Sequence, residues 1–143
     1  LDTLEQQFGR RFSHAATSFP PGTDPRISIN VLESAGLEVS HVLDEPTAVA
    51  DLLQLDNAGV VDIGGGTTGI AIVKKGIVAR HIEGQGITDL WLAGGSCMQP
   101  GVAALFCKQF PALQVHLPQH SLFMTPLAIA SSGREKAEGL YAK

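Results

Sequence analysis

The segment VDIGGGTT, residues Val61–Thr68, decides how this sequence folds. An apolar run, Gly59–Ile63, contains an acidic residue near its end and leads into three consecutive glycines, and a second apolar run covers Ile70–Val73. Glycines permit a tight turn, including positive φ, so the pattern predicts a β-hairpin with a glycine-rich tip. A plain hairpin turn remains the alternative, although such a turn needs only one or two glycines.

The same segment carries groups that suit a phosphate and a metal ion. The backbone N–H groups of Gly64–Gly66 can form a concave anion site, and Thr67 and Thr68 add hydroxyl donors. Asp62, at the end of the predicted strand, can hold a hydrated Mg²⁺ ion over the phosphates. No Gly-Lys-Ser/Thr follows the glycines, so the segment is not a Walker A loop.

Two further segments are weak signals when each is taken alone. WLAGGS, Trp91–Ser96, places a diglycine turn between a strand and a helix that Pro100-Gly101 begins. Because glycines have no side chains, a planar ring of a ligand could lie against the backbone of this turn. An ordinary strand-to-helix loop explains this segment as well. LDEPTA, Leu43–Ala48, has a helix cap at Asp44 and a proline in the first turn, and a simple capped helix start is the favoured interpretation by itself.

Strand and helix patterns alternate along the rest of the chain, which favours an α/β fold with much of the sheet parallel. Asp24 and Pro25 begin an early helix, which Gly36 ends. Pro126 is expected to delay the start of the last helix, and a polar tail is expected from Gly133. The remaining predicted strands are His14–Phe19, Val39–Leu43, Asp89–Ala93 and Gln114–Leu117, and the remaining predicted helices are Pro100–Phe110 and Leu122–Ser132.

Two positions indicate that residues of a longer protein are missing. The chain begins at Leu1, without a methionine, inside a predicted polar helix, Leu1–Phe8. A third strand is expected after Lys74-Lys75, yet Ile77–Glu83 looks helical and has neither a cap nor a connecting loop. We interpret the Gly76–Ile77 join as the trace of a missing segment.

Composition excludes several classes of protein. Of the 143 residues, 44% are hydrophobic and 17% are charged, which is enough apolar content to bury a core. The net charge is -4, and no basic run is longer than Arg10-Arg11 or Lys74-Lys75, which argues against nucleic-acid binding. No apolar run is long enough to span a membrane. Cys97 and Cys107 form no CxxC motif, so a reducing, cytoplasmic location is expected.

The histidines are expected to have structural or solvated roles. His116 and His120 are four residues apart, as in some metal pairs, but Pro118 between them argues against a shared helix face. No carboxylate lies near them in sequence.

Together, and in this order, the three segments resemble the actin/Hsp70/sugar-kinase ATPase superfamily. Val61–Thr68 resembles its second phosphate loop, and Leu92–Ser96 with Pro100-Gly101 resembles its adenosine motif. Glu45–Ala48 is similar to the first connecting helix of the Hsp70-like branch, and Pro126–Gly133 would be the second connecting helix.

The resemblance implies an α/β, actin-like ATPase fold with RNase-H-like lobes, present here in part. Residues 1–57 would be a remnant of lobe I, with a strand-helix-strand unit and the connecting helix. Residues 58–143 would be the core of lobe II, with the phosphate hairpin and the adenosine motif but without its outer subdomain, and with the suspected break at 76/77.

The resemblance also implies ATP and Mg²⁺ as cofactors. Asp62 and Glu45 would be the catalytic residues, and Asp62 would bind Mg²⁺ through water. The cofactor-binding residues would be Gly64, Gly65, Gly66, Thr67 and Thr68 for the phosphates, and Gly94, Gly95 and Ser96 for adenosine and ribose. Closure of the lobes would link the nucleotide to the binding of partner proteins.

Three departures from the family pattern reduce the expected activity. The first phosphate loop would precede Leu1, the third strand and outer subdomain of lobe II would be lost at 76/77, and Leu127 stands where Hsp70-like relatives often carry an acid. We therefore expect weak ATP binding and little hydrolysis, and a sheet edge left exposed for a homodimer.

Three functions remain open at this point. They are a nucleotide-gated, chaperone-like ATPase, a protein-binding module whose ATPase has decayed, and a small-molecule kinase of the same superfamily. Asp62 and the glycine loop favour the ATPase over the decayed module. The sequence of Glu45–Ala48, which is similar to that of the Hsp70-like branch, favours the ATPase over the kinase.

Overall fold

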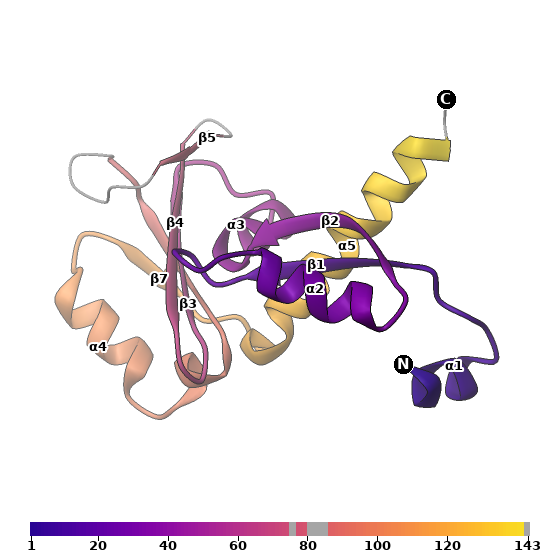
Figure 1. Ribbon diagram of the computed structural model, residues 1–143. Helices are drawn as coiled ribbons and strands as arrows, with labels where there is room; N and C mark the ends of the chain where they lie inside the picture. The colour runs from indigo at the N-terminus through magenta and orange to yellow at the C-terminus, as the bar shows by residue number, and fades with distance from the viewer. Residues whose placement is uncertain (75–76, 80–85, 142–143) are drawn as a thin grey trace.

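The structure, a computed structural model, describes residues 1–74, 77–79 and 86–141 (Figure 1). The helices are α1 (Asp2–Phe8), α2 (Arg26–Ser34), α3 (Glu45–Leu52), α4 (Val102–Gln109) and α5 (Ser121–Tyr141), with a 3₁₀ turn, η1 (Gly95–Met98). The strands are β1 (His14–Phe19), β2 (Glu38–Asp44), β3 (Ala58–Ile63), β4 (Thr68–Lys74), β5 (Ile77–Ala79), β6 (Asp89–Ala93) and β7 (Gln114–His116). The alternation predicted from the sequence is therefore present.

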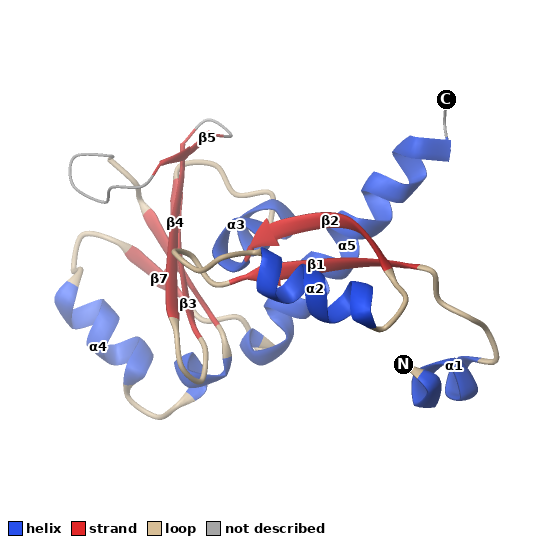
Figure 2. Ribbon diagram, viewed as in Figure 1, coloured by secondary structure: helices blue, strands red, loops and turns tan. Residues whose placement is uncertain are grey.

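The strands form two sheets, which α3 and α5 connect (Figure 2). β1 and β2 are parallel, and α2 and α5 both contact this pair. The second sheet has the order β5-β4-β3-β6-β7. Its antiparallel half is β3-β4-β5, in which the glycine turn joins β3 to β4. Its parallel half, β3-β6-β7, needs crossovers such as the one that contains α4.

Each face of the five-stranded sheet has its own core. Because side chains alternate along a strand, Val60 and Val61 of β3 point to opposite faces. Val60 packs with Val49 of α3 and Met124 of α5, whereas Val61 packs with Leu92 and with Phe106 of α4. This burial on both faces explains why β3 is an unbroken apolar run until Asp62.

The prediction of a helix at Ile77–Glu83 is wrong for its first three residues. Ile77–Ala79 is the strand β5, which pairs antiparallel with Ile72–Lys74 of β4. β-Branched residues favour a strand when an edge is available to pair with, and an uncapped short helix has little stability of its own. The third strand that we expected to be missing is therefore present. The remainder of the predicted helix and the join at residue 76 lie outside the described residues.

The predicted end of the last helix is also wrong, because α5 begins at Ser121, includes Pro126 and continues through Gly133 to Tyr141. Strong helix formers follow the glycine, and Arg134 donates to Glu138 at 2.8 Å, one turn further on. A Cβ atom at position 133 would lie 2.6 Å from Cβ of Ala16 in β1. The glycine therefore allows α5 to approach β1 and does not end the helix.

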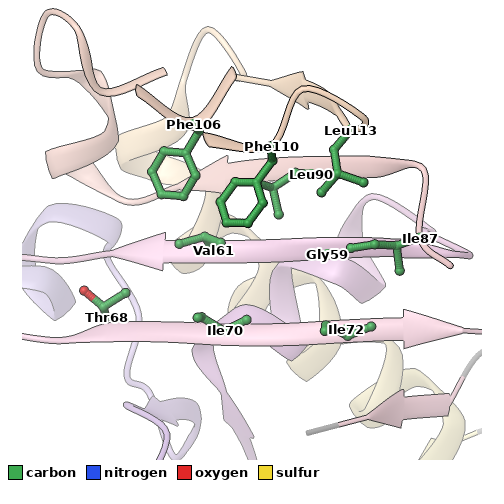
Figure 3. Close-up of a pocket in the computed structure, with 10 residues that line it drawn as sticks. All are labelled: Gly59, Val61, Thr68, Ile70, Ile72, Ile87, Leu90, Phe106, Phe110 and Leu113. Carbon is green, nitrogen blue, oxygen red and sulfur yellow. The ribbon is translucent and has the colours of Figure 1, made fainter. Parts of the chain in front are cut away.

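An apolar cavity of about 150 Å³ lies between α4 and the five-stranded sheet. Figure 3 shows Phe106 and Phe110 above the strands that carry Val61 and Ile70. Ile70 is 47% exposed although it lines this cavity, so the apolar face of β4 is incompletely covered. In the described part of the chain, no helix is both long and apolar enough to cross a membrane.

Candidate functional site

A cleft of about 410 Å³ brings most of the predicted site residues together. The helix α3, the end of β3, the loop after β6 and the first turn of α5 meet there. We call this the central cleft, and its lining residues are Glu45, Asp62, Gly64, Gly65, Gly94, Gly95, Ser96, Leu122 and Thr125. Gly66, Thr67 and Thr68 do not line it, and Thr68 instead lines the apolar cavity on the α4 side of the sheet.

Asp62 lies at the end of β3, opposite Ala93 of β6 in the parallel register, and is only 5% exposed. The Thr125 hydroxyl donates a hydrogen bond of 2.5 Å to its Oδ2. Its Oδ1 lies against Gly94, where an added Cβ atom would overlap both Oδ1 and the carbonyl oxygen of Ile63. Gly94 also has a φ of +86°, so space and backbone conformation both require glycine there.

Glu45 enters the cleft as the first residue of α3. Asp44 caps this helix by accepting the N–H of Thr47 at 3.1 Å, and Pro46 is in the first turn, as predicted. Burial, and next the negative charge of Asp62, raise the pKa of Glu45, while a hydrogen bond from Ser18 opposes the rise. The cleft therefore holds two carboxylates that repel one another.

The glycine turn after β3 exposes backbone on its open side. Gly64 donates its N–H to the carbonyl oxygen of Thr67 at 3.0 Å, and a Cβ atom added at Gly65 or Gly66 would meet nothing within 4 Å. None of these three glycines has a positive φ. The expected reason for the glycines, a left-handed turn, therefore does not apply, and their effect here is an uncovered backbone.

The second glycine segment is fixed to the first and to α5. The Ser96 hydroxyl donates to the carbonyl oxygen of Gly64 at 2.9 Å. The Gly94 N–H donates to the carbonyl oxygen of Ser121 at 3.0 Å. A Cβ atom at Gly95 would lie 2.9 Å from Cδ1 of Leu122. The predicted phosphate and adenosine segments thus form one connected wall of the cleft.

The sequence analysis missed the contribution of α5. Ser121 is fully buried and its hydroxyl lies 3.1 Å from the Leu92 carbonyl oxygen and 3.2 Å from that of Gly94. Thr125 and Leu122 line the cleft. The available signal was the spacing of Ser121 and Thr125, because hydroxyl residues four apart lie on one helix face.

The cleft fits a hydrated Mg²⁺ ion with a nucleotide better than it fits a metal held by protein alone. Among the described residues, no group of three or more His, Cys, Asp or Glu side chains is placed to hold a metal ion. Mg²⁺ commonly keeps several waters and binds one or two carboxylates together with substrate phosphates, and Glu45 and Asp62 can supply those carboxylates. The volume of about 410 Å³ is also typical of small-molecule sites.

His116 has a structural role, as expected, but it has a carboxylate partner that is distant in sequence. Its Nε2 lies 2.7 Å from Oδ1 of Asp89, and its ring stacks on Trp91 at 4.3 Å between ring centres. Hydrogen bonds from Thr88 and from His116 lower the pKa of Asp89.

The two cysteines are free and differ in exposure. Cys97 is buried, which raises the pKa of its thiol, and Cys107 is exposed.

Sequence comparison finds close relatives, although no protein-family model matches the chain. The ethanolamine utilization protein EutJ of Escherichia coli (strain K12) is 72% identical over 197 residues, which cover 100% of this chain and 71% of that protein. EutJ of Salmonella typhimurium is 66% identical over 196 residues, which cover 99% of this chain and 70% of that protein. These spans exceed the 143 residues of the chain, so the relatives have positions within them that lack a counterpart here.

Two more distant similarities support the fold. The chaperone protein DnaK of Thermus thermophilus is 28% identical over 119 residues, which cover 77% of this chain and 19% of that protein. The crystal structure of EutJ from Carboxydothermus hydrogenoformans has a TM-score of 0.72 and 26% identity, and covers 90% of this chain and 69% of that one. The superfamily inferred from the three segments is confirmed. The chain belongs to the family of the ethanolamine utilization protein EutJ and has the actin-like ATPase fold of the Hsp70 proteins.

Proposed function

We propose that this chain binds Mg²⁺–ATP in the central cleft and acts as a chaperone-type protein of ethanolamine utilisation. In this proposal the bound nucleotide controls the binding of partner proteins. The observation that carries it is the placement of the Asp62 and Glu45 carboxylates beside two glycine segments, the open turn at Gly64–Gly65 and the closely packed Gly94–Gly95.

Each part of the cleft has a role in this proposal. Asp62 would hold the water shell of Mg²⁺, and the N–H groups of Gly65 and Gly66 would donate to phosphate oxygens. The Gly64 N–H already donates to Thr67, so Gly64 would contribute its place in the cleft wall, and the Thr67 and Thr68 hydroxyls would act only if the turn moved toward the cleft. The bare backbone of Gly94 and Gly95, with Ser96, would lie against adenosine and ribose. The nucleotide supplies a phosphoanhydride bond whose hydrolysis changes the charge held in the cleft.

Glu45 would accept a hydrogen bond from the attacking water. Burial and the charge of Asp62 raise its pKa, which makes its carboxylate a better proton acceptor than an ordinary glutamate. Positioning and charge neutralisation account for most of the catalysis of phosphoryl transfer, so a chain with one phosphate loop would hydrolyse ATP slowly.

A catalytically inactive protein-binding scaffold is the second candidate, and one surface favours it. Phe123 and Leu127 are four apart on α5 and are 56% and 53% exposed, next to the cleft residue Leu122. Exposed apolar side chains that share a helix face are typical of protein-binding surfaces. The partners would be ethanolamine-pathway enzymes or microcompartment proteins in the cytoplasm. Phosphate transfer to a small acceptor would instead favour a small-molecule kinase.

A calorimetric titration of Mg²⁺–ATP into the chain, Asp62→Asn and Asp2→Asn tests the proposal. We expect binding by the chain and by Asp2→Asn, which changes an acid of α1 far from the cleft in sequence, and loss of binding in Asp62→Asn. Equal binding by all three would place the nucleotide elsewhere. Absence of binding by the unsubstituted chain would leave the scaffold as the better proposal.

The remaining partner to propose is a second copy of this chain. In the described residues β5 pairs only with Ile72–Lys74, so the same edge of β4 is unpaired from Thr68 to Ala71. An unpaired edge can bond to the same edge of another copy about a two-fold axis. Ile70 lies in this stretch and is exposed, which supplies an apolar contact at its centre.

A further inference from the structure

The first two turns of α5 contact the wall of the central cleft at three points. The Ser121 hydroxyl contacts the carbonyl oxygens of Leu92 and Gly94, and Leu122 packs against Gly95. The third contact is the hydrogen bond that Thr125 donates to Asp62. Only this third contact reaches an ionisable group of the cleft.

The carboxylate of Asp62 is held from two sides. Its Oδ2 accepts the Thr125 hydroxyl, and its Oδ1 lies against the bare backbone of Gly94. A carboxylate oxygen has two lone pairs, so one accepted bond leaves capacity for a further donor. The hydroxyl therefore fixes the orientation of the group and leaves it able to accept hydrogen bonds from a water in the cleft.

The position of α5 does not depend on this hydrogen bond. Met124 and Ala128, on either side of Thr125, are buried against the core that contains Val60 and Val49. The Ser121 contacts hold the beginning of the same helix. Removal of one hydroxyl at position 125 should therefore leave the helix where it is and release only the carboxylate.

We infer that Thr125 is a positioning residue, which holds Asp62 in the orientation that receives the water shell of Mg²⁺. The inference rests on the proposed function, because it assigns Thr125 to the metal within that site. A hydrogen bond to an ionised carboxylate is stronger than one between neutral groups, and a ligand that is already oriented loses less freedom when the metal binds.

Calorimetric titrations of ATP with Mg²⁺, and with a chelator in its place, test this role. The quantity measured is the ratio of the two affinities, which is the gain due to the metal. Thr125→Val keeps the shape of the side chain and removes the donor, and we expect it to reduce this gain about tenfold with the metal-free affinity unchanged. Thr125→Ser keeps the donor and should retain the gain.

Thr88→Val is the matched control, because Thr88 donates a similar hydrogen bond of 2.5 Å to Asp89, which does not line the central cleft. It should retain the full gain. A full gain in Thr125→Val, or an equal loss in Thr125→Ser, would overturn the inference and leave the proposed function standing. If the unsubstituted chain binds no nucleotide in either titration, both fail. An unfolded variant is recognised by the loss of its metal-free affinity.

Discussion

Asp62 and Glu45 share one cleft, but their surroundings differ. Asp62 is almost fully buried and accepts the Thr125 hydroxyl, whereas Glu45 is half-buried at the start of α3. Burial of Glu45 and its repulsion by Asp62 disfavour its charged form. Such an arrangement destabilises the fold near neutral pH and is common where charged groups are kept for a ligand.

Replacing Glu45 by glutamine is expected to stabilise the chain near neutral pH. The pKa of Glu45 is raised on folding, so protonation of this residue stabilises the folded chain. The stabilisation is fully present below the ordinary pKa of 4.5 and is lost as the pH rises through the pKa that Glu45 has in the folded chain. Glutamine stays neutral throughout. Thermal unfolding should therefore give a higher Tm for Glu45→Gln at neutral pH and converging Tm values below 4.5.

Glu33→Gln is the control for this experiment, because Glu33 is exposed on α2 and is not among the residues that line the central cleft. Its Tm should follow that of the unsubstituted chain at every pH. A lower Tm for Glu45→Gln at neutral pH would show that the carboxylate stabilises the fold and would contradict the argument.

Gly94→Ala should be far more destabilising than Gly101→Ala. Both glycines have a positive φ, +86° and +90°, which residues with a side chain rarely adopt. Nothing lies within 4 Å of a Cβ atom at Gly101, so alanine there costs only the conformational penalty of about 1 to 2 kcal/mol. At Gly94 the added atom also overlaps Asp62, so we expect about 2 to 5 kcal/mol.

Urea unfolding of the two alanine variants measures this difference. Equal losses of unfolding free energy would mean that the loop after β6 can move away from Asp62. In that event the close contact between the two glycine segments of the cleft would not be a fixed part of the site.

Most strands and helices could be predicted because their signals are local. His14–Phe19 and Asp89–Ala93 are confirmed residue for residue, since turn or cap residues bound each run. The strand at Ile77–Ala79 could not be predicted, because it depends on the free edge of β4, which lies outside that segment. The role of Gly133 depends in the same way on Ala16, which is distant in sequence.

In the candidate site, too, residues with local signals could be predicted and residues with distant partners could not. Asp62, Glu45 and Gly94 stand beside turns or caps that the sequence displays, and they meet in the cleft as expected from the resemblance. Thr125 and Ser121 lie inside a helix, where a hydroxyl gives no local sign of its partner. Their roles became visible only once β3, β6 and α5 were placed side by side.

Gly133→Ala is expected to destabilise α5, although alanine favours a helix by about 1 kcal/mol over glycine. The new methyl group would lie 2.6 Å from Cβ of Ala16. Overpacking of this kind costs about 1 to 3 kcal/mol, which exceeds the gain in propensity.

A double-mutant cycle with Ala16→Gly separates the two effects. Because Ala16→Gly removes the colliding atom, the double variant should recover most of the unfolding free energy that Gly133→Ala loses. Chemical denaturation of the four proteins gives the coupling energy. A coupling near zero, or a stabilising Gly133→Ala, would show that α5 can move away from β1 without cost.

At the scale of the whole molecule, α5 connects the cleft to both sheets. Its first turn holds the cleft wall, and further along Ser132 lies 2.8 Å, Oγ to Nε2, from His41 of β2. Gly133 lies against β1. A ligand that moves Asp62 would change the contact that Asp62 makes with Thr125 of this helix, and the helix also packs on the β1-β2 sheet. The proposed link between the nucleotide and partner binding would use this connection.

Among the described residues, the face that carries α4 and β4 is the least completely covered. The apolar cavity there is lined by Ile70, Ile72 and Phe106, and the described part of β5 covers only one end of β4. Apolar surface next to an unpaired strand edge favours association, because one contact then buries side chains and satisfies backbone groups together.

Sedimentation equilibrium should therefore show a dimer of this chain that Ile70→Lys abolishes. A charge at the centre of the unpaired edge would have to be buried without a partner, which opposes pairing. Ile27→Lys is the matched control, since Ile27 is 67% exposed on α2 and does not line the apolar cavity. Concentrations up to about 1 mM detect an association of about 4 kcal/mol. A monomer at that concentration, or equal dissociation by the two lysine variants, would rule out pairing through β4.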